Sequence, residues 1–460
     1  MNINSRQVAL DIIIEVMENE GFVHVLLNQA LSKYAFIDKR ERSFITRLTK
    51  GTIEQVILLD YIIDQYSKMP VHKMKPFIRN VLRMTVYQLK DMKSVPDMAA
   101  CNESVKLVKQ RGLHMLSGFV NGVSRNIARG LPQLNIPKDL SLQYSMPKWI
   151  LDEWGKRYTE EEITAILESF QDEGANGTCV RILGNVVSRN IVPENKVSKE
   201  ELLIILQSEG ISYREHEFLN HCIYISNFDS LEKTKSFQNG YYQVQDSASI
   251  LLGELLPLKK GNKCLDMCAA PGGKTIMMAD IIGETGQVIS RDVSYEKCAL
   301  IEENRMRCHF DTIQIEEFDA LVYDSYSKNQ YDLVLVDAPC SGLGIIGSKP
   351  DIKYKMTKEK QVQLQQLQRT ILKNAMQYVK DDGYLVYSTC TISPYENEDN
   401  VDFILEQKEF VQHRLKAYLP EKLAEKIDDT KGIQLLPGIH KSEGFFISIF
   451  HKEGGENESR

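Results

Sequence analysis

LDMCAAPGGKT, residues 265–275, is the stretch that decides which fold to expect. The apolar run Lys263–Met267 predicts a buried strand, and a helix is expected to begin near Lys274. Between them, Pro271-Gly272-Gly273 lets the backbone pass close to a ligand, because glycine has no Cβ to collide with it. The free N–H groups at the start of the helix would face that ligand. The loop matches neither GxGxxG nor GxxxxGKS/T, so it predicts a ligand-binding turn of another kind.

Strand and helix patterns alternate from residue 261 onward. The expected strands are Lys263–Met267, Gln287–Arg291, Thr312–Ile315, Tyr331–Val336, Tyr384–Tyr387 and Gly444–His451. Helical segments separate most of them, which predicts an open, mostly parallel, doubly wound α/β sheet of the Rossmann-like kind. Ligands of such a sheet bind outside the carboxyl ends of its strands.

Two aspartates follow the second and third of these strands. Asp292 lies 19 residues after Gly273, where a carboxylate accepts hydrogen bonds from ribose hydroxyls. Asp319 is placed to meet the exocyclic amine of an adenine. The loop and the two acids, in this order, predict a nucleoside cofactor.

Two cysteine loops, Asp337-Ala338-Pro339-Cys340 and Ser388-Thr389-Cys390, follow two further strands and lie 50 residues apart. Taken singly, each cysteine is more simply explained as a small buried hydrophobe. Their matching positions at strand ends favour nucleophilic chemistry instead, because a thiolate there faces the ligand crevice.

A cysteine nucleophile suits one reaction in particular. Cytosine C5 is a poor nucleophile, but addition of a thiolate to C6 makes C5 enamine-like, so that it can attack an electrophilic methyl group. Asp337 is well placed to hydrogen-bond N3 and the exocyclic amine of the base. A second cysteine would assist when the first one leaves.

Composition excludes several classes. No run approaches ~20 apolar residues, so no membrane span is expected. The first residues lack a basic segment followed by an apolar one, and the nine cysteines are scattered without paired CxxC motifs. We expect a cytoplasmic protein with free thiols and no metal site.

The front of the chain differs in pattern and charge from the rest. Residues 1–132 predict an all-helical bundle of about six or seven helices, residues 133–245 a linker and a small α+β subdomain, and residues 246–452 the catalytic domain. Residues 1–130 contain 19 Lys and Arg against 12 Asp and Glu, a net charge of +7, whereas the rest carries −14. This asymmetry indicates either an anion-binding module or a solvated helical surface.

The loop at 265–275, the segment Asp337–Gly342 and the segment Tyr387–Thr391 resemble the motifs of S-adenosylmethionine-dependent RNA cytosine-C5 methyltransferases. The resemblance implies a class I methyltransferase fold, Cys390 as the covalent nucleophile and Cys340 as the cysteine that assists release. It also implies S-adenosyl-L-methionine contacts from Cys268, Ala269, Ala270, Pro271, Gly272, Gly273, Lys274, Asp292, Asp319 and Asp337. DNA cytosine-C5 methyltransferases place their nucleophile in the Pro-Cys motif, which here would be Cys340.

The front segments Asp38–Arg42, Gly51-Thr52 and Phe119–Asn126 resemble a NusB-type RNA-binding domain. The combination is similar to bacterial 16S rRNA cytosine-C5 methyltransferases of the Sun/RsmB type. It implies a monomer that acts on 16S rRNA, at the cytosine conventionally numbered 967. Ser124 and Arg291 depart from the family pattern, which has Leu and an apolar residue at these places.

Alternatives stay open at this point. The same catalytic motifs would serve a tRNA or 23S rRNA methyltransferase, and the front domain alone would suit a non-catalytic factor in antitermination or ribosome assembly. Arg125 and Arg129 lie one helical turn apart and suit either phosphate binding or a solvated face. Lys274 suits a ligand contact or a surface position, and Glu396 and Asp399 are expected to cap the helix that follows Cys390.

Overall fold

The computed structural model describes residues 3–34, 36–171, 177–184 and 197–454. The chain divides into two compact units. Unit 1 comprises Met1–Gln171 with Ile346–Met356, and unit 2 comprises Asp172–Ile345 with Thr357–Arg460. The three-part division predicted from the sequence stays a prediction.

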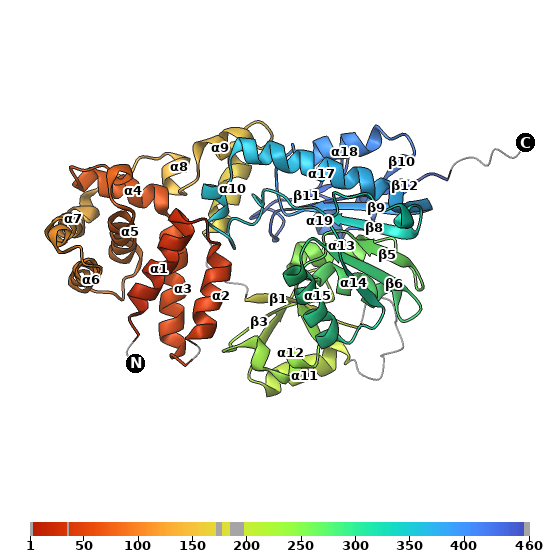
Figure 1. The fold of residues 1–460 in the computed structure, drawn as a ribbon, viewed down its shortest axis with the longest axis horizontal. Coiled ribbons are helices and arrows are strands. Elements are labelled where there is room, and N and C mark those ends of the chain that lie inside the picture. The colour runs from red at the N-terminus through yellow and green to blue at the C-terminus, as the bar shows by residue number, and fades with distance from the viewer. Residues whose placement is uncertain (1–2, 35, 172–176, 185–196, 455–460) are drawn as a thin grey trace, which may run out of the picture. The chain divides into compact units, whose positions relative to one another are not determined.

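The first part of unit 1, residues 3–130, is the expected helical bundle, drawn in red to orange in Figure 1. Its helices are α1 (Ser5–Glu18), α2 (Val23–Lys33), α3 (Lys39–Glu54), α4 (Val56–Tyr66), α5 (Pro76–Asp91), α6 (Asp97–Gln110) and α7 (Ser117–Gly130). The central helix α5 packs against α1, α3, α4, α6 and α7. Pro76 starts α5 and Pro96 precedes α6, because proline is tolerated where a helix begins but not inside it. Shorter helices α8 (Leu140–Gln143), α9 (Lys148–Trp154) and α10 (Glu160–Phe170) follow.

A segment from far along the chain completes unit 1. Residues 346–356, which include the short helix α16 (Ile352–Lys355), belong to this unit although the chain on both sides belongs to unit 2. The Lys353 ammonium donates to the carbonyl oxygens of Glu54 (2.8 Å) and Tyr144 (3.4 Å), and Tyr354 Oη donates to the Glu54 carbonyl at 3.2 Å. We call residues 346–356 the returning arm.

Unit 2 contains a small antiparallel sheet in the order β2-β3-β1-β4. Its strands are β1 (Thr178–Ile182), β2 (Ser212–Glu215), β3 (Cys222–Ser226) and β4 (Tyr242–Val244), with helices α11 (Lys199–Ser208) and α12 (Lys235–Gln238). Ser198 and Glu201 form a capping box at the start of α11, each side chain accepting from the other residue's backbone N–H. The mixture of strands and helices predicted for this stretch is therefore present, whereas its status as a separate subdomain stays a prediction.

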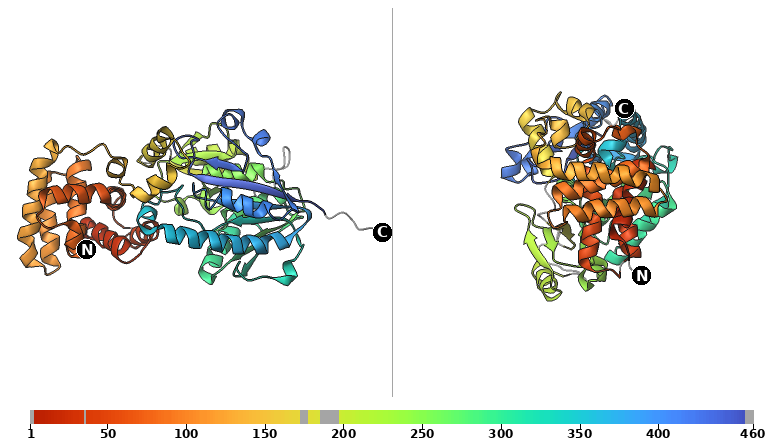
Figure 2. Two further views of the ribbon diagram at one scale, coloured as in Figure 1. Left: turned by 90° about the horizontal axis from the view of Figure 1, so that it is seen from above. Right: turned by 90° about the vertical axis from the view of Figure 1, so that its left-hand side faces the viewer.

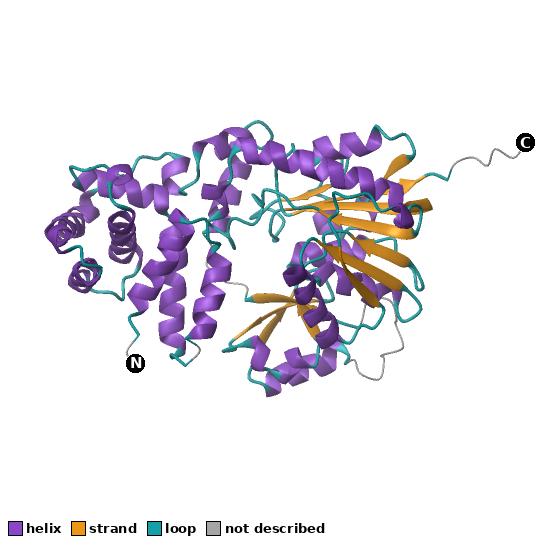
Figure 3. Ribbon diagram, viewed as in Figure 1, coloured by secondary structure: helices purple, strands orange, loops and turns teal. Residues whose placement is uncertain are grey.

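The large sheet of unit 2 has the order β10-β12-β9-β8-β5-β6-β7, and β11 pairs with β12 (Figure 3). The strands are β5 (Lys263–Asp266), β6 (Gln287–Asp292), β7 (Ile313–Glu317), β8 (Tyr331–Asp337), β9 (Val379–Thr389), β10 (Phe410–His413), β11 (Ile433–Leu435) and β12 (Phe445–Lys452). The strands from β9 to β7 run parallel, whereas β10, β11 and β12 pair antiparallel. The predicted mostly parallel sheet is therefore confirmed, with an antiparallel edge.

Helices cover both faces of this sheet, as a doubly wound fold requires. Leu333 and Leu335 of β8 share one core with α13 (Ser247–Leu255) and α14 (Gly273–Ile282). Val334 and Val336 share the other core with α17 (Lys358–Tyr378) and α18 (Glu398–Leu405). α17 runs along the sheet in Figures 1 and 2. Alternate residues of one strand thus face opposite layers, and loops are left free at the strand ends. The remaining helices are α15 (Tyr295–Cys308) and α19 (Glu421–Ala424).

Candidate active site

A buried carboxylate ties strand β5 to helix α14. Asp266 Oδ2 accepts from Thr275 Oγ1 at 2.7 Å, and Thr275 Oγ1 lies 2.9 Å from Ser290 Oγ on β6. Burial raises the pKa of Asp266 to about 7. Within the described part of the chain, Asp266 Oδ1 is buried without a hydrogen-bond partner. The first turn of α14 is therefore held against the strand ends by side-chain hydrogen bonds.

The loop between β5 and α14 leaves an open backbone surface. Ala270 N–H donates to Asp292 Oδ2 at 2.9 Å, which ties the loop to the end of β6. Gly272 has φ +101°, a left-handed conformation that favours glycine, and a Cβ there would come within 3.2 Å of Ile301. At Gly273 the nearest atom to a missing Cβ is 3.9 Å away, on Gln245. Gly273 therefore leaves room for a ligand to approach the backbone.

The two aspartates predicted to bind a nucleoside lie at the ends of neighbouring parallel strands. Asp292 ends β6, where its Oδ1 accepts from Val293 N–H at 2.8 Å and pairs with Lys297 at 3.0 Å. Asp319 lies just beyond β7 and is exposed, and its Oδ1 accepts from Leu321 N–H at 2.9 Å. Each carboxylate oxygen has two lone pairs, so both side chains can still accept from ligand hydroxyl or amino groups.

The two predicted cysteines are in contact. Cys340 Sγ and Cys390 Sγ lie 3.3 Å apart, although 50 residues separate them in sequence. Both are free, half-buried thiols that follow the adjacent parallel strands β8 and β9. Contact with Cys390, together with burial, raises the pKa of Cys340 well above its ordinary value.

An ion pair joins the cysteine loops to the loop at 265–275. Asp337 Oδ2 accepts from Lys274 Nζ at 2.7 Å, and Asp337 Oδ1 accepts from Ser388 Oγ at 2.7 Å. Burial disfavours the charged form of Lys274 and by itself would lower its pKa. The negative charges nearby have the larger combined effect and raise the pKa of Lys274; they belong to Asp337, Asp246 and Asp266. Lys274 is thus not a surface residue: it links the Asp337 carboxylate to the start of α14.

Sequence reasoning missed the role of Glu396. We expected it to cap the helix after Cys390, and this was wrong: the cap of α18 is Asn397, and Glu396 points elsewhere. The fully buried Glu396 Oε2 accepts from Ser341 N–H at 2.8 Å and from Gln368 Nε2 at 2.9 Å. Burial raises the pKa of Glu396. The carboxylate thereby anchors the residue that follows Cys340, 55 positions earlier in the chain.

Arg291, which stands where the family pattern has an apolar residue, forms ion pairs with two carboxylates. Its Nε donates to Glu316 at 2.7 Å and a terminal nitrogen donates to Asp324 at 2.8 Å, while the guanidinium lies 4.5 Å from the Phe318 ring centroid. A buried arginine is tolerated in a strand only with such partners. The other departure, Ser124, is buried in α7.

Comparisons with known proteins agree with this geometry. Residues 254–451 match the family model described as 16S rRNA methyltransferase RsmB/F, and residues 3–129 match the NusB family. The chain is 33% identical to "Probable ribosomal RNA small subunit methyltransferase B" of Bacillus subtilis over 457 residues, which covers 98% of this chain and 99% of that protein. The chain belongs to the RsmB family of ribosomal RNA methyltransferases. A protein of the same printed name from Synechocystis is 28% identical over 98% of this chain and 100% of its own length.

A solved structure supports the fold of the whole chain. The crystal structure of PH0851 superposes with a TM-score of 0.80 at 22% identity and covers 98% of this chain and 100% of its own. The RsmB-family enzyme described here is a methyltransferase that uses S-adenosyl-L-methionine and acts on RNA. Among the residues that the structure describes, no helix is long and apolar enough to cross a membrane. The same residues include no cluster of three or more His, Cys, Asp or Glu side chains suited to a metal ion.

Proposed function

We propose that the enzyme methylates C5 of a cytidine in small-subunit ribosomal RNA through a covalent bond between Cys390 and C6 of the base. One arrangement carries the proposal. Two free thiols lie 3.3 Å apart at strand ends, and the Asp337–Lys274 ion pair links the first cysteine loop to the loop at 265–275. A thiolate supplies the nucleophile, and the neighbouring carboxylate supplies a hydrogen-bond acceptor for the amino edge of cytosine.

The protein's own groups account for activation of the base. The Cys390 thiolate forms a bond to C6, and the electron pair of the C5–C6 double bond becomes available at C5. The proton lost by the Cys390 thiol ends on N3 and returns to the sulfur when the S–C6 bond breaks. Asp337 accepts hydrogen bonds from this N3–H and from the exocyclic amine, so negative charge does not build up on the ring. After C5 has been methylated, a base removes the C5 proton, the S–C6 bond breaks, and the double bond re-forms. The target base must leave its stack for C6 to reach Cys390.

The residues around the loop at 265–275 suit the methyl donor. S-adenosyl-L-methionine, when bound, supplies an electrophilic methyl group on a sulfonium sulfur. Asp292 would accept from its ribose hydroxyls and Asp319 from its adenine amine. The open backbone at Gly273 and the unpartnered Asp266 Oδ1 support a ligand at this loop. The other residues assigned to the cofactor are Cys268, Ala269, Ala270, Pro271, Gly272, Lys274 and Asp337.

The two cysteines take different roles in this proposal. The Cys340 thiol lies 3.3 Å from Cys390 Sγ, close enough to donate a hydrogen bond to it. When the product leaves, the same S–H is at hand for the departing Cys390 sulfur, which makes Cys340 the release cysteine.

The front bundle selects the RNA in this proposal. Residues 1–132 act as the NusB-like RNA-binding domain, residues 133–245 as the connecting subdomain, and residues 246–452 as the catalytic domain. The target proposed is the 16S cytosine conventionally numbered 967, and the match to the NusB and RsmB/F models supports it. Bisulfite sequencing of ribosomal and transfer RNA from a strain without this gene tests the choice. Loss of methylation at a tRNA or 23S rRNA cytosine instead would show that the enzyme acts on that RNA and not on 16S rRNA.

The roles of the cysteines are tested with labelled RNA on denaturing gels. Cys390→Ala should abolish methylation and form no adduct, whereas Cys340→Ala should accumulate a protein–RNA covalent complex. Cys308→Ala, a buried cysteine at the end of α15, is the matched control and should methylate normally. An adduct in Cys390→Ala and none in Cys340→Ala would reverse the assignment.

A further inference from the structure

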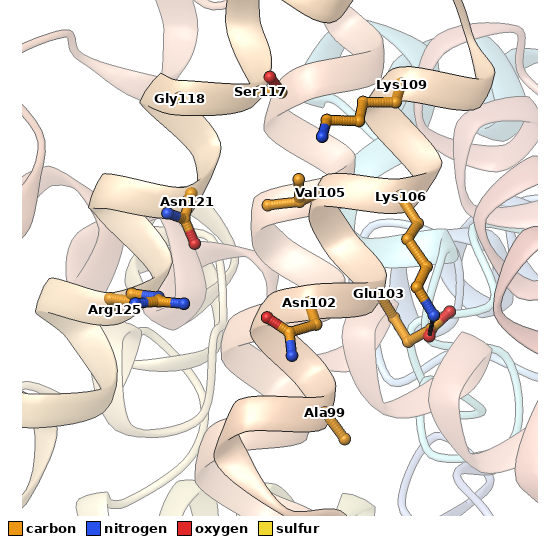
Figure 4. Close-up of a pocket in the computed structure, with 10 residues that line it drawn as sticks. All are labelled: Ala99, Asn102, Glu103, Val105, Lys106, Lys109, Ser117, Gly118, Asn121 and Arg125. Carbon is orange, nitrogen blue, oxygen red and sulfur yellow. Dashed lines mark hydrogen bonds and ion pairs between the residues drawn. The ribbon is translucent and has the colours of Figure 1, made fainter.

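A polar groove lies between helices α6 and α7 of unit 1, whereas the residues assigned to catalysis belong to unit 2. It encloses about 570 Å³ (Figure 4). Side chains from both helices point toward it, and the donors among them come from Asn102, Lys106 and Lys109 of α6 and from Asn121 and Arg125 of α7. Amide and cationic groups thus line a space that neither helix closes.

The two helices that line the groove are basic. From the start of α6 to the end of α7, residues 97–130 contain five Lys and Arg against two acidic residues, Asp97 and Glu103, a net charge of +3. Two arginines deeper in the bundle are neutralised by carboxylates: Arg79 pairs with Glu18, and Arg83 pairs with Asp60 at 2.7 Å.

Inside the groove, one cation is paired and two are not. Lys106 pairs with Glu103 at 2.6 Å. Within the described residues, Lys109 and Arg125 have neither an ion-pair partner nor a side-chain hydrogen bond, and both are exposed. The Asn102 and Asn121 amides are likewise without a partner inside the described protein. Exposed, unpaired donors of these types are the ones that contact phosphate and sugar oxygens.

The α7 side of the groove also has glycines where side chains would otherwise stand. Gly118 lines the groove, and Gly122 lies one turn further along the helix; around either missing Cβ there is no atom within 4 Å. Glycine inside a helix costs up to about 1 kcal/mol relative to alanine. Neither glycine is explained by tight packing, since nothing packs against it. The open space would admit a ligand backbone close to the helix.

We propose that the groove between α6 and α7 binds the sugar–phosphate backbone of the substrate RNA. Arg125 and Lys109 contact phosphates, and Asn102 and Asn121 contact phosphate or ribose oxygens. The inference rests on the proposed function for the identity of the RNA, but not for the existence of the contact. It locates RNA binding on a particular face of the front bundle.

The test compares charge reversals in the full-length enzyme. Arg125→Glu should raise the Kd for a 16S rRNA transcript by about tenfold or more, because it removes a charge-assisted hydrogen bond to phosphate and adds a negative charge that repels it. The slope of log K against log salt should fall by about 0.7–0.9 for the lost phosphate contact. Lys68→Glu reverses the charge of an exposed lysine just after α4, outside the groove and outside the segments that resemble a NusB-type domain, and is the matched control. Gly118→Leu fills the groove in open space without a change of charge, and should also weaken binding.

Methyl transfer at saturating RNA separates this inference from the proposed function. The Arg125→Glu variant should keep the wild-type kcat and lose only affinity, because Arg125 has no catalytic role. If Arg125→Glu weakens RNA binding while even the wild-type enzyme fails to methylate the transcript, the result supports RNA binding by the groove and rejects the proposed substrate. If Arg125→Glu binds as tightly as Lys68→Glu, or if wild-type enzyme does not bind the transcript, the groove proposal is overturned.

Discussion

Two cysteine pairs in unit 2 have the same distance between their sulfur atoms but very different surroundings. Cys179 and Cys222 have their sulfur atoms 3.3 Å apart, as do Cys340 and Cys390. The first pair joins the neighbouring antiparallel strands β1 and β3, and Cys222 is fully buried in an apolar core. The second pair follows parallel strands, and the half-buried Asp337 comes directly after the buried part of β8.

The difference teaches that a short distance between sulfurs does not define a site. What distinguishes Cys340 and Cys390 is the polar frame around their loops: Lys274 and Ser388 hold Asp337, and Glu396 holds Ser341. Cys179 and Cys222 instead lie within strands, where the buried Arg181–Asp280 ion pair (3.0 Å) ties β1 to α14. The predictions below act on one pair or on its frame, from the largest expected effect to the smallest.

Removal of the charge at Asp337 should have the largest effect. Asp337→Asn keeps the size of the side chain but loses the acceptor proposed for the amino edge of cytosine and the partner of Lys274. We expect kcat to fall by about 10²–10⁴-fold, the usual range for a positioned acid or base. Transfer of labelled methyl groups to the RNA measures it. Asp311→Asn, at an exposed aspartate of the same unit, should leave kcat unchanged.

Loss of the Glu396 anchor should have the next largest effect. Glu396→Leu leaves the Ser341 N–H and the Gln368 amide buried without their acceptor, at a cost of roughly 1–3 kcal/mol each in the free energy of unfolding. Glu396→Gln retains one oxygen that can accept from both donors, so it should restore most of the stability. Urea unfolding of the two variants checks this. Equal loss of stability in both would show that hydrogen bonding to Ser341 is not what Glu396 provides.

The other cysteine pair should matter for stability alone. Cys222→Ala removes a fully buried sulfur and should lower the free energy of unfolding by about 1–2 kcal/mol through the small cavity that remains. The kcat for methyl transfer should stay at the wild-type value. A Cys222→Ala enzyme that unfolds like the wild type but fails to methylate RNA would remove the contrast between the pairs.

The smallest effect is a change in how stability depends on pH. The hydrogen bond to Cys222, with burial, raises the pKa of Cys179. Above the ordinary thiol pKa of about 8.5, the unfolded chain has lost this proton while the folded chain retains it. The free energy of unfolding therefore falls as pH rises, by up to about 1.4 kcal/mol per pH unit for this one group. Cys179→Ala should make the decline between about pH 9 and pH 10 shallower. An unchanged slope in chemical unfolding would contradict it.

Sequence reasoning went furthest where function depends on strand ends. A hydrophobic run followed by a short polar loop predicts a strand whose loop lies at the carboxyl edge of a parallel sheet. For this reason the sequence alone could predict that Cys340 and Cys390 lie in the same crevice. The helical front bundle and the doubly wound sheet followed from hydrophobic periodicity in the same way.

Contacts set by distant side chains could not be predicted. Glu396 accepts from a backbone N–H 55 residues away, and Lys353 of the returning arm donates to Glu54, 299 residues away. No local pattern marks either pairing, because each depends on how whole elements pack. The groove between α6 and α7 likewise arises from two helices together. Arg125 was noticed in the sequence, but its partners across the groove were not.

Mass spectrometry of a trapped complex tests the central claim most directly. RNA that carries 5-fluorocytidine at the target position lets the thiol add and the methyl group transfer, but fluorine at C5 cannot leave as a proton does. Wild-type enzyme, digested with protease and nuclease, should yield a nucleotide attached to the peptide that contains Cys390. A nucleotide attached instead to the peptide that contains Cys340, or methylated product released without any attachment, would contradict the account.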